Sequence, residues 1–268
     1  MQLALRSILI TMLLALSSAA VAGPLADGEA ACQRQEYATA LRLWRPLADQ
    51  GDAGAQVFLG GLYLEGLGVP QDYADALRWF RKAADQGSVW GQTSPGLMYH
   101  DGQGITKNYI EAARWFRKAA DQGDATAQTS IGNMYFTGQG MAKNYGEAVK
   151  WYNKAAKQND IDAQLQLGHI YREGDGAPQD YAEAVKWIRK AAEQDDVGGQ
   201  FAIGDMYEEG HGVPQGYVIA YMWFNLAAAH SDRLAMAARA ARYVLASKMT
   251  PAQIAEAQRL AREWKPTK

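Results

Sequence analysis

The stretch GVPQDYADALRWFRKAADQG, residues 68–87, decides the fold, because its pattern returns along the chain every 36 residues. No insertion breaks the register, in which Tyr73 is followed by Tyr109, Tyr145, Tyr181 and Tyr217, and Trp79 by Trp115, Trp151, Trp187 and Trp223. A strict period between about 20 and 50 residues is typical of a repeat array, in which each unit buries its apolar face by stacking on its neighbours. The pattern therefore predicts an architecture and says little about a ligand.

Five regular units are predicted, at residues 51–86, 87–122, 123–158, 159–194 and 195–230. The first helix of each unit opens at a residue whose side chain can accept from the unpaired N–H groups of the first turn. It closes at a glycine, which adopts the left-handed conformation without steric cost. The predicted N-caps are Asp52, Ser88, Asp124, Asp160 and Asp196, and the closing glycines are Gly66, Gly102, Gly138, Gly174 and Gly210.

The second helix of four units opens with Asp or Asn, followed three positions later by Asp or Glu, which is a variant of the reciprocal capping box. These pairs are Asp72 with Asp75, Asn108 with Glu111, Asn144 with Glu147, and Asp180 with Glu183. A glycine also recurs inside each first helix, where it costs about 1 kcal/mol relative to alanine. We therefore expect two helices to approach closely at Gly60, Gly96, Gly132, Gly168 and Gly204.

Two different segments flank the regular units. Residues 23–50 are predicted to form a degenerate amino-terminal repeat, in which Pro46 should bend the second helix locally. Residues 231–268 are predicted to form carboxyl-terminal capping helices, the last of which opens with N-cap Thr250, Pro251 and the capping-box partner Gln253. The end of a solenoid needs a polar outer face, and we assign that role to Arg239, Arg242, Arg259, Arg262 and Glu263.

Residues 1–22 have the features of a secretory signal peptide, with Arg6 before an apolar run and Ala20-Val21-Ala22 as the cleavage pattern. The apolar run is shorter than the roughly 20 residues that a membrane span needs. We expect cleavage after Ala22, a periplasmic or secreted chain, and no stable membrane insertion after cleavage. The alternative is a retained amphipathic anchor.

The composition excludes several functions. With 27 Lys and Arg against 29 Asp and Glu, the net charge is −2, which argues against nucleic-acid binding. Cys32 is the only cysteine, so we expect a small buried hydrophobe, the alternative being a thiol that pairs between chains. The four histidines show no H-E-x-x-H motif, and the glycine-rich turns lack G-K-[ST], so no metal and no cofactor are predicted.

The unit A-x-A-Q-x-x-L-G-x-x-Y-x-x-G-x-G-V-P-Q-D-Y-x-x-A-x-x-W-x-x-K-A-A-x-Q-G, residues 53–87, resembles the Sel-one-like repeat, a relative of the tetratricopeptide repeat. The resemblance covers residues 51–230, and residues 249–264 resemble the tail of many bacterial members. It implies an all-α fold, a right-handed superhelical solenoid of antiparallel helix pairs. It also implies a non-enzymatic adaptor that binds a partner protein or peptide in the bacterial envelope, and we expect the chain itself to be a monomer.

Two other functions stay open. One branch of the family is linked with β-lactam binding or hydrolysis, which suggests a cell-wall-related or β-lactam hydrolase. This chain lacks the paired cysteines of that branch and has no S-x-x-K motif. The other function is a secreted factor that binds a host protein.

The candidate partner-binding residues lie on the first helices. By analogy with tetratricopeptide arrays these helices line the concave face, and positions that differ between units are free to encode a partner. Exposed aromatic residues are enriched among binding hot spots, although a neutral drift of these positions is an equal alternative. The candidates are Trp90, Thr93, Leu97, His100, Thr129, Asn133, Phe136, Leu165, His169, Arg172, Phe201, Asp205 and Glu208.

Pro95 breaks the repeat rule inside a first helix, where proline costs about 3 kcal/mol. A kink there could direct Trp90 and Thr93 toward a ligand. The alternative is drift that a redundant array tolerates.

Overall fold

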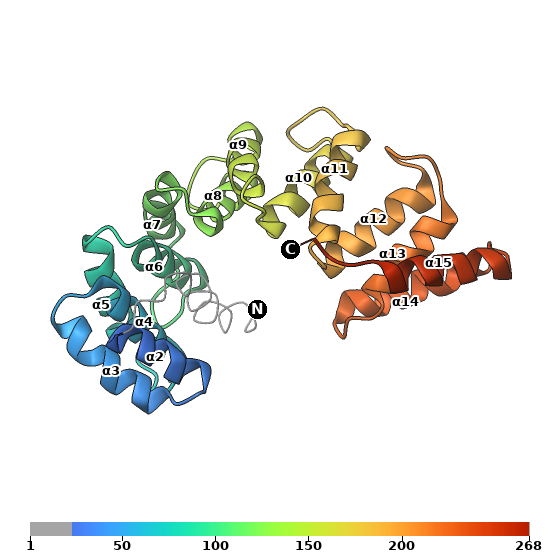
Figure 1. The fold of residues 1–268 in the computed structure, drawn as a ribbon. Coiled ribbons are helices and arrows are strands. Elements are labelled where there is room, and N and C mark those ends of the chain that lie inside the picture. The colour runs from blue at the N-terminus through green and yellow to red at the C-terminus, as the bar shows by residue number, and fades with distance from the viewer. Residues whose placement is uncertain (1–22, 268) are drawn as a thin grey trace. The chain divides into compact units, whose positions relative to one another are not determined.

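A computed structural model describes residues 23–267, and every described element is an α-helix. The signal peptide predicted at residues 1–22 lies outside the described residues. Consecutive helices lie side by side along each part of the chain (Figure 1). The helices are α2 (Pro24–Gln33), α3 (Tyr37–Asp49), α4 (Ala53–Glu65), α5 (Tyr73–Asp85), α6 (Val89–Asp101), α7 (Tyr109–Asp121), α8 (Ala125–Thr137), α9 (Tyr145–Ala156), α10 (Ile161–Glu173), α11 (Tyr181–Glu193), α12 (Val197–Glu209), α13 (Tyr217–Ala227), α14 (Arg233–Ala246) and α15 (Pro251–Glu263).

The helices divide into two compact units, each of which contains more than one 36-residue repeat. The first holds residues 23–127 and 139–142, and the second holds residues 128–138 and 143–267. Within the first unit α4 packs on α5 and α6 on α7, and within the second α10 packs on α11 and α12 on α13. The predicted all-α solenoid of consecutive helix pairs is thus confirmed, whereas the handedness of its superhelix stays a prediction.

Helix starts and ends follow the predicted caps. Asp52 Oδ1 accepts from Ala55 N at 2.7 Å, and the other four predicted caps accept in the same way. Gly66 and its four counterparts all have positive φ. The second helices differ from the prediction, because Asp72 accepts from Asp75 N but the Asp75 carboxylate pairs with Arg78 at 2.9 Å. Only the last described helix, α15, has both halves of a capping box, through Thr250 and Gln253.

The recurring glycines have the packing role that the sequence predicts. A Cβ atom added at Gly60 would lie 2.6 Å from the Phe80 ring. The same separation would hold between Gly96 and Phe116, whereas Gly168 faces Ile188. Each first helix therefore accepts a large side chain of its own second helix directly against its backbone. The cost of a glycine inside a helix is offset by this close contact.

A row of buried glutamines also runs through the units. Gln164 is fully buried, its Nε2 donates to Ala156 O of the preceding unit at 3.3 Å, and its Oε1 accepts from Gln194 Nε2 at 2.9 Å. Gln56 makes the same two bonds: its Nε2 donates to Ala48 O, and its Oε1 accepts from Gln86 Nε2. We call such a pair a glutamine rung. Each rung joins the two helices of one 36-residue repeat to each other and to the preceding repeat.

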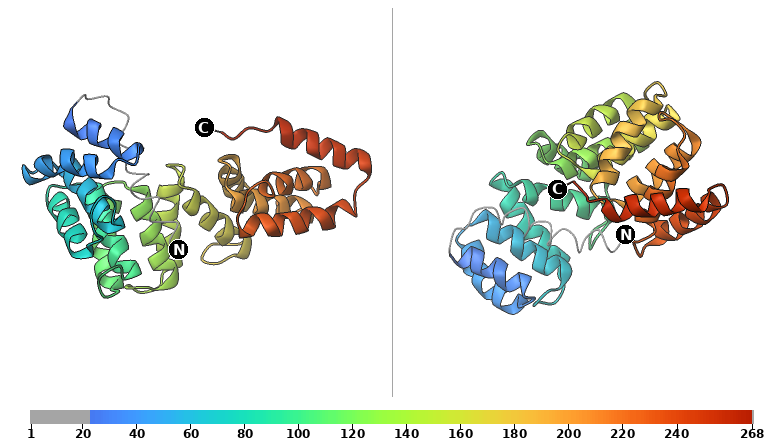
Figure 2. Two further views of the ribbon diagram at one scale, coloured as in Figure 1. Left: turned by 90° about the horizontal axis from the view of Figure 1, so that it is seen from below. Right: turned by 45° about the vertical axis from the view of Figure 1, so that its right-hand side comes forward.

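Two prolines lie inside helices, and both ends of the described chain are helical. Helix α3 continues through Pro46, and α6 continues through Pro95. Cys32 is buried in α2, where burial raises the pKa of its thiol to about 11, as expected of a small buried hydrophobe. At the other end, α14 packs on α13 and α12, and α15 packs on α13 (Figure 2).

The predicted polar outer face of the carboxyl-terminal end is partly present on α14, where Arg239 is exposed and Arg242 is half-buried. Arg239 Nε donates to Ala228 O at 3.0 Å, and Arg242 Nη1 donates to Asn225 Oδ1 at 2.6 Å, so both side chains cover the end of α13. Unpaired carbonyls at the end of a helix attract such cations. On α15 the prediction is right for Arg259, which is exposed and pairs with Glu256.

Candidate functional site

The first helices carry the candidate surface, and the structure removes two residues from it. Thr93 and Thr129 are buried, with 1% and 6% of their surfaces exposed. Thr93 Oγ1 donates to Asp124 Oδ1 at 3.1 Å, and Thr129 Oγ1 donates to Asp160 Oδ1 at 2.9 Å. Each threonine therefore bonds to the N-cap of the first helix in the next repeat. The prediction that they face a partner is corrected, because stacking of the units covers both hydroxyls.

The other candidates on α6 are half-buried. Trp90 packs against the apolar core of the first unit. His100 Nδ1 lies 2.7 Å from Asp101 Oδ1, and its ring meets Tyr109 edge-on at 5.3 Å between centroids. Leu97 lies one turn before His100. Partial burial leaves these side chains able to contribute area to an interface, although each already has an internal partner or core contact.

On α8 the two remaining candidates contact the following helix. Asn133 is exposed, and its Oδ1 accepts from Tyr152 O–H at 2.7 Å. Burial raises the pKa of the Tyr152 phenol well above its usual range, so the phenol is a donor throughout the physiological pH range. Phe136 meets Tyr145 edge-on at 5.0 Å between ring centroids. Both candidates are therefore held in place while part of each stays accessible.

The candidates on α10 and α12 form the most polar part of the surface. His169 is exposed, and Arg172 Nε donates to Glu173 Oε1 at 2.8 Å. Glu208 Oε1 accepts from Lys248 Nζ at 2.9 Å. Leu165 and Phe201 are half-buried apolar residues one to two turns earlier on their helices. The structure thus brings charged and apolar candidates together within the second unit.

Carboxylates dominate this region, which we call the acidic face: Asp160, Asp162, Asp196, Asp205, Glu208 and Glu209. The pKa of Asp205 is raised to about 6, chiefly by burial and also by the charges of Glu209 and Glu208, against the opposing charge of Arg172. The pKa of the exposed Asp162 is also raised, by partial desolvation and by the charges of Asp160 and Asp196. Asp162 is thus coupled to Asp160 and Asp196 at the starts of the two helices, and Asp205 is coupled to Glu208 and Glu209 further along α12.

Sequence reasoning missed Asp162 and Glu209 as members of the acidic face. The candidates were first-helix positions whose residue differs between repeats, and the carboxylates that recur in the repeats were interpreted as caps. Asp162 and Glu209 are not caps. An excess of acidic over basic residues on α10 and α12 was the available signal, since the two helices with their N-caps hold seven carboxylates and one arginine.

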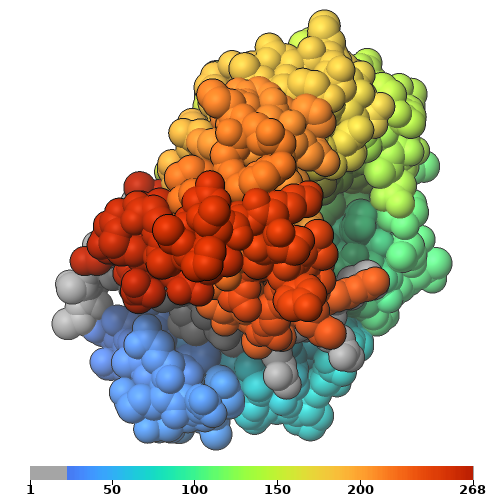
Figure 3. Space-filling model, turned by 90° about the vertical axis from the view of Figure 1, so that its right-hand side faces the viewer, coloured from blue at the N-terminus to red at the C-terminus, as the bar shows by residue number. Residues whose placement is uncertain are grey.

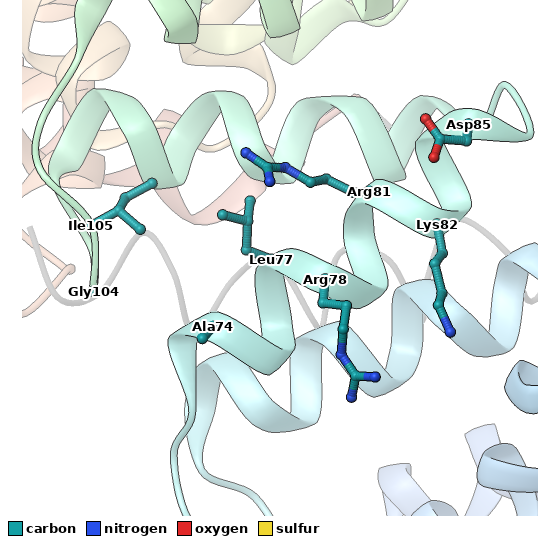
Figure 4. Close-up of a pocket in the computed structure, with 8 residues that line it drawn as sticks. All are labelled: Ala74, Leu77, Arg78, Arg81, Lys82, Asp85, Gly104 and Ile105. Atoms are coloured by element: carbon teal, nitrogen blue, oxygen red, sulfur yellow. The ribbon is translucent and has the colours of Figure 1, made fainter.

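A cavity of about 480 Å³ lies on α5 beside the loop that follows α6 (Figure 4). Leu77 and Arg81 extend on the side of Ile105, whereas Arg78 and Lys82 extend away from it (Figure 4). Its cations already have partners: Arg81 donates to Tyr99 O–H at 2.6 Å, and Lys82 Nζ lies 4.3 Å from the centroid of the Trp79 ring. The cations that line the cavity therefore already interact with neighbouring aromatic side chains, and we assign the cavity no ligand.

Residues 23–267 contain neither a metal-binding group of side chains nor a membrane-spanning helix. Within that range no three His, Cys, Asp or Glu side chains are grouped so that they could hold a metal ion. Over the same range no helix has both the length and the apolar character needed to cross a membrane.

Comparisons with known proteins identify the repeat. The Sel1 repeat family model matches residues 53–88, 96–124, 125–160, 161–196 and 197–232. Residues 89–95, which include Trp90, Thr93 and Pro95, fall outside every match. No curated protein matches the chain.

Solved structures give the same family. A Sel1 repeat protein from Oxalobacter formigenes is 32% identical with a TM-score of 0.74, covering 90% of this chain and all of its own. A Sel1 repeat protein from Klebsiella pneumoniae is 21% identical with a TM-score of 0.50, covering 76% of this chain and 97% of its own. An immunity protein from Pseudomonas aeruginosa is 17% identical with a TM-score of 0.50, covering 83% and 80%. The last two share the fold alone, and together with the repeat matches the first shows that this chain belongs to the Sel1 repeat family.

Proposed function

We propose that the chain is a non-enzymatic protein-interaction scaffold of the bacterial envelope, and that the acidic face of α10 and α12 binds a basic segment of a partner protein. Sel1 repeat proteins are generally protein-interaction scaffolds. The observation that carries the finer proposal is the surplus of carboxylates on α10 and α12, which with their N-caps hold seven carboxylates and one arginine, so that Asp205 lies near the like charges of Glu208 and Glu209, which repel it. A partner's Lys or Arg side chains would relieve that repulsion.

The rest of the surface supports the same role. His169 is exposed beside the carboxylates, and half-buried Phe201 and Leu165 supply apolar area. Interfaces combine such apolar contacts with charged groups that steer association and select the partner. Placement in the envelope rests on the signal peptide predicted at residues 1–22.

Site-specific photocrosslinking in intact cells tests the binding surface. A photoreactive residue at His169 should capture a partner, whereas the same residue at Lys186, an exposed position on second helix α11, should not. The double variant Asp162→Asn/Asp205→Asn should weaken capture at His169 and reduce its dependence on salt. Asp85→Asn/Asp121→Asn, which removes two exposed carboxylates from second helices, is the matched control.

Two results would overturn the proposal. One is equal capture at His169 and Lys186, and the other is an equal loss of capture in both double variants. Cell fractionation tests the location: the full chain should be recovered outside the cytoplasm, and a chain without residues 2–22 should stay inside. Recovery of both chains in the cytoplasm would contradict the envelope assignment.

A further inference from the structure

Helix α14 exposes an apolar stripe on its outer side. Met236 is 66% exposed, Tyr243 82% and Val244 54%, and Ala237 and Ala240 beside them are also exposed. These five residues follow the helical spacing i, i+1, i+4, i+7 and i+8, so they share one side of the helix. We call them the α14 stripe. The carboxyl-terminal helices, drawn in red, form an open surface of the second unit (Figure 3).

The core contacts of α14 are made by the side of the helix opposite the α14 stripe. The opposite side of α14 buries Ala235, Ala238 and Leu245 against the second unit. Arg239 and Arg242, which could have covered an outer face, instead bond to groups at the end of α13. Single exposed hydrophobic residues are common, whereas a contiguous helix face of them indicates an interface.

The stripe is complementary to itself. If two copies of α14 lie antiparallel about a two-fold axis at Ala240, each residue faces the one whose number completes a sum of 480. Met236 then faces Val244 of the other copy, and Ala237 faces Tyr243. Ala240 meets its own equivalent, so the helices can approach closely at the centre. Larger residues thus oppose smaller ones on both sides of the central Ala240 pair, which suits ridges packing into grooves.

The charges at the two ends of α14 agree with the same arrangement. The N-cap Asp232 faces Lys248 of the other copy in this register, and both residues are exposed. Lys248 also pairs with Glu208 of its own chain, with 47% of its side chain exposed. Antiparallel helices place each positive amino-terminal end beside a negative carboxyl-terminal end. The stripe itself carries no charge that would oppose pairing.

We propose that the α14 stripe is a homodimer interface, in which two copies of this chain pair their α14 helices antiparallel about Ala240. The proposal departs from the monomer expected from the sequence and does not depend on the proposed partner at the acidic face. A two-fold interface needs only one self-complementary patch. Because one helix pair buries less than a standard interface, the dimer should be weak and reversible, and should form at about 10 µM to 1 mM.

Sedimentation equilibrium over that concentration range is the first test. The average mass of the chain should rise toward twice that of one copy. Ala240→Glu should hold the chain as a monomer, because two carboxylates would meet on the axis. Ala255→Glu adds the same charge at an exposed alanine of α15 and should leave dimerisation unchanged.

Cysteine crosslinking in a Cys32→Ala background tests the register. Ala240→Cys should form a disulfide-linked dimer, whereas Ala255→Cys should not. An equal mixture of Met236→Cys and Val244→Cys chains should crosslink several-fold faster than either chain alone, because only the mixture places two thiols opposite each other. Circular dichroism of every variant would establish that each is folded.

Any of four results would overturn the proposal. The first is a wild-type chain that stays monomeric up to about 1 mM. The second is equal dimerisation of the Ala240→Glu and Ala255→Glu variants, which would place the interface elsewhere. The third is a cysteine mixture that crosslinks no faster than its components, which would exclude the antiparallel register. A monomer whose stripe captures another protein also counts against the proposal.

Discussion

The fourth repeat (residues 159–194) and the fifth repeat (residues 195–230) form their glutamine rungs differently. In the fourth unit Gln164 is bonded on both sides, to Ala156 O and to Gln194 Nε2. In the fifth unit the position of Gln194 is occupied by His230, and the Oε1 atom of the buried Gln200 has no hydrogen-bond partner. Gln200 Nε2 donates to Asp195 Oδ1 at 2.8 Å, and His230 Nε2 lies 3.5 Å from the same oxygen.

Close apolar packing is kept in both repeats. A Cβ atom added at Gly204 would lie 2.6 Å from Phe224, and a Cβ atom added at Gly168 would be similarly close to Ile188. The polar rung is lost only in the last regular unit, which is followed by α14 and α15. The difference indicates that apolar contact between the two helices is needed in every unit, whereas the polar rung serves the regular stack.

The largest predicted effect tests whether apolar packing in the last regular repeat is as strong as in an earlier repeat. Phe116→Ala and Phe224→Ala should each lower the free energy of unfolding of their unit by about 3 to 5 kcal/mol, because both rings are buried against a glycine. Urea unfolding followed by circular dichroism measures the loss. A much smaller loss for Phe224→Ala would show that the last unit is loosely packed, which the geometry does not indicate.

A smaller effect is expected from removing a complete rung. Gln194→Ala leaves Gln164 Oε1 buried without a donor and should cost about 1 to 3 kcal/mol. His230→Ala is the matched change in the last unit. It should cost less than about 0.5 kcal/mol, because it removes only a partly exposed pair with Asp195. Equal costs for the two variants would refute the difference between the units.

The missing rung can also be built. His230→Gln places a side-chain amide where the regular units have one, and it should donate to Gln200 Oε1. The expected gain is about 0.5 to 1.5 kcal/mol in the free energy of unfolding. The midpoint of thermal unfolding measures it, with wild type as reference. A neutral or destabilising result would mean that the backbone at residue 230 does not reproduce the geometry of Gln194.

The smallest effect concerns pH and the acidic face. The pKa of Asp205 is about 6 in the folded chain against 3.8 for the ordinary side chain. The folded state therefore holds this proton more tightly, and its contribution to stability is complete below about pH 3.8 and is lost as pH rises through 6. Stability relative to Asp205→Asn should fall between those values and stay level above them. Urea titrations of both chains at several pH values would show a parallel pair of curves if Asp205 were unshifted.

Much of this protein follows from its sequence. The 36-residue period, the N-caps such as Asp52 and the closing glycines such as Gly66 predicted the helices correctly, because these signals act within one or two turns of the chain. The contact of Gly60 with Phe80 was also predictable, since a conspicuous glycine in a helix needs a packing reason.

The tertiary structure decided which polar side chains are available. Thr93 and Asp205 both vary between units on first helices, yet the Thr93 hydroxyl bonds to the next unit and the Asp205 carboxyl gathers with other acids. Likewise Arg239 and Arg242 were both expected at the outer face, yet Arg239 stays exposed while it bonds to the end of α13, and Arg242 is half-buried and bonds to Asn225. Caps and periods are local, so the sequence determined them by itself. The direction and neighbours of a long or polar side chain depend on the helices that pack around it, and only the assembled fold sets those.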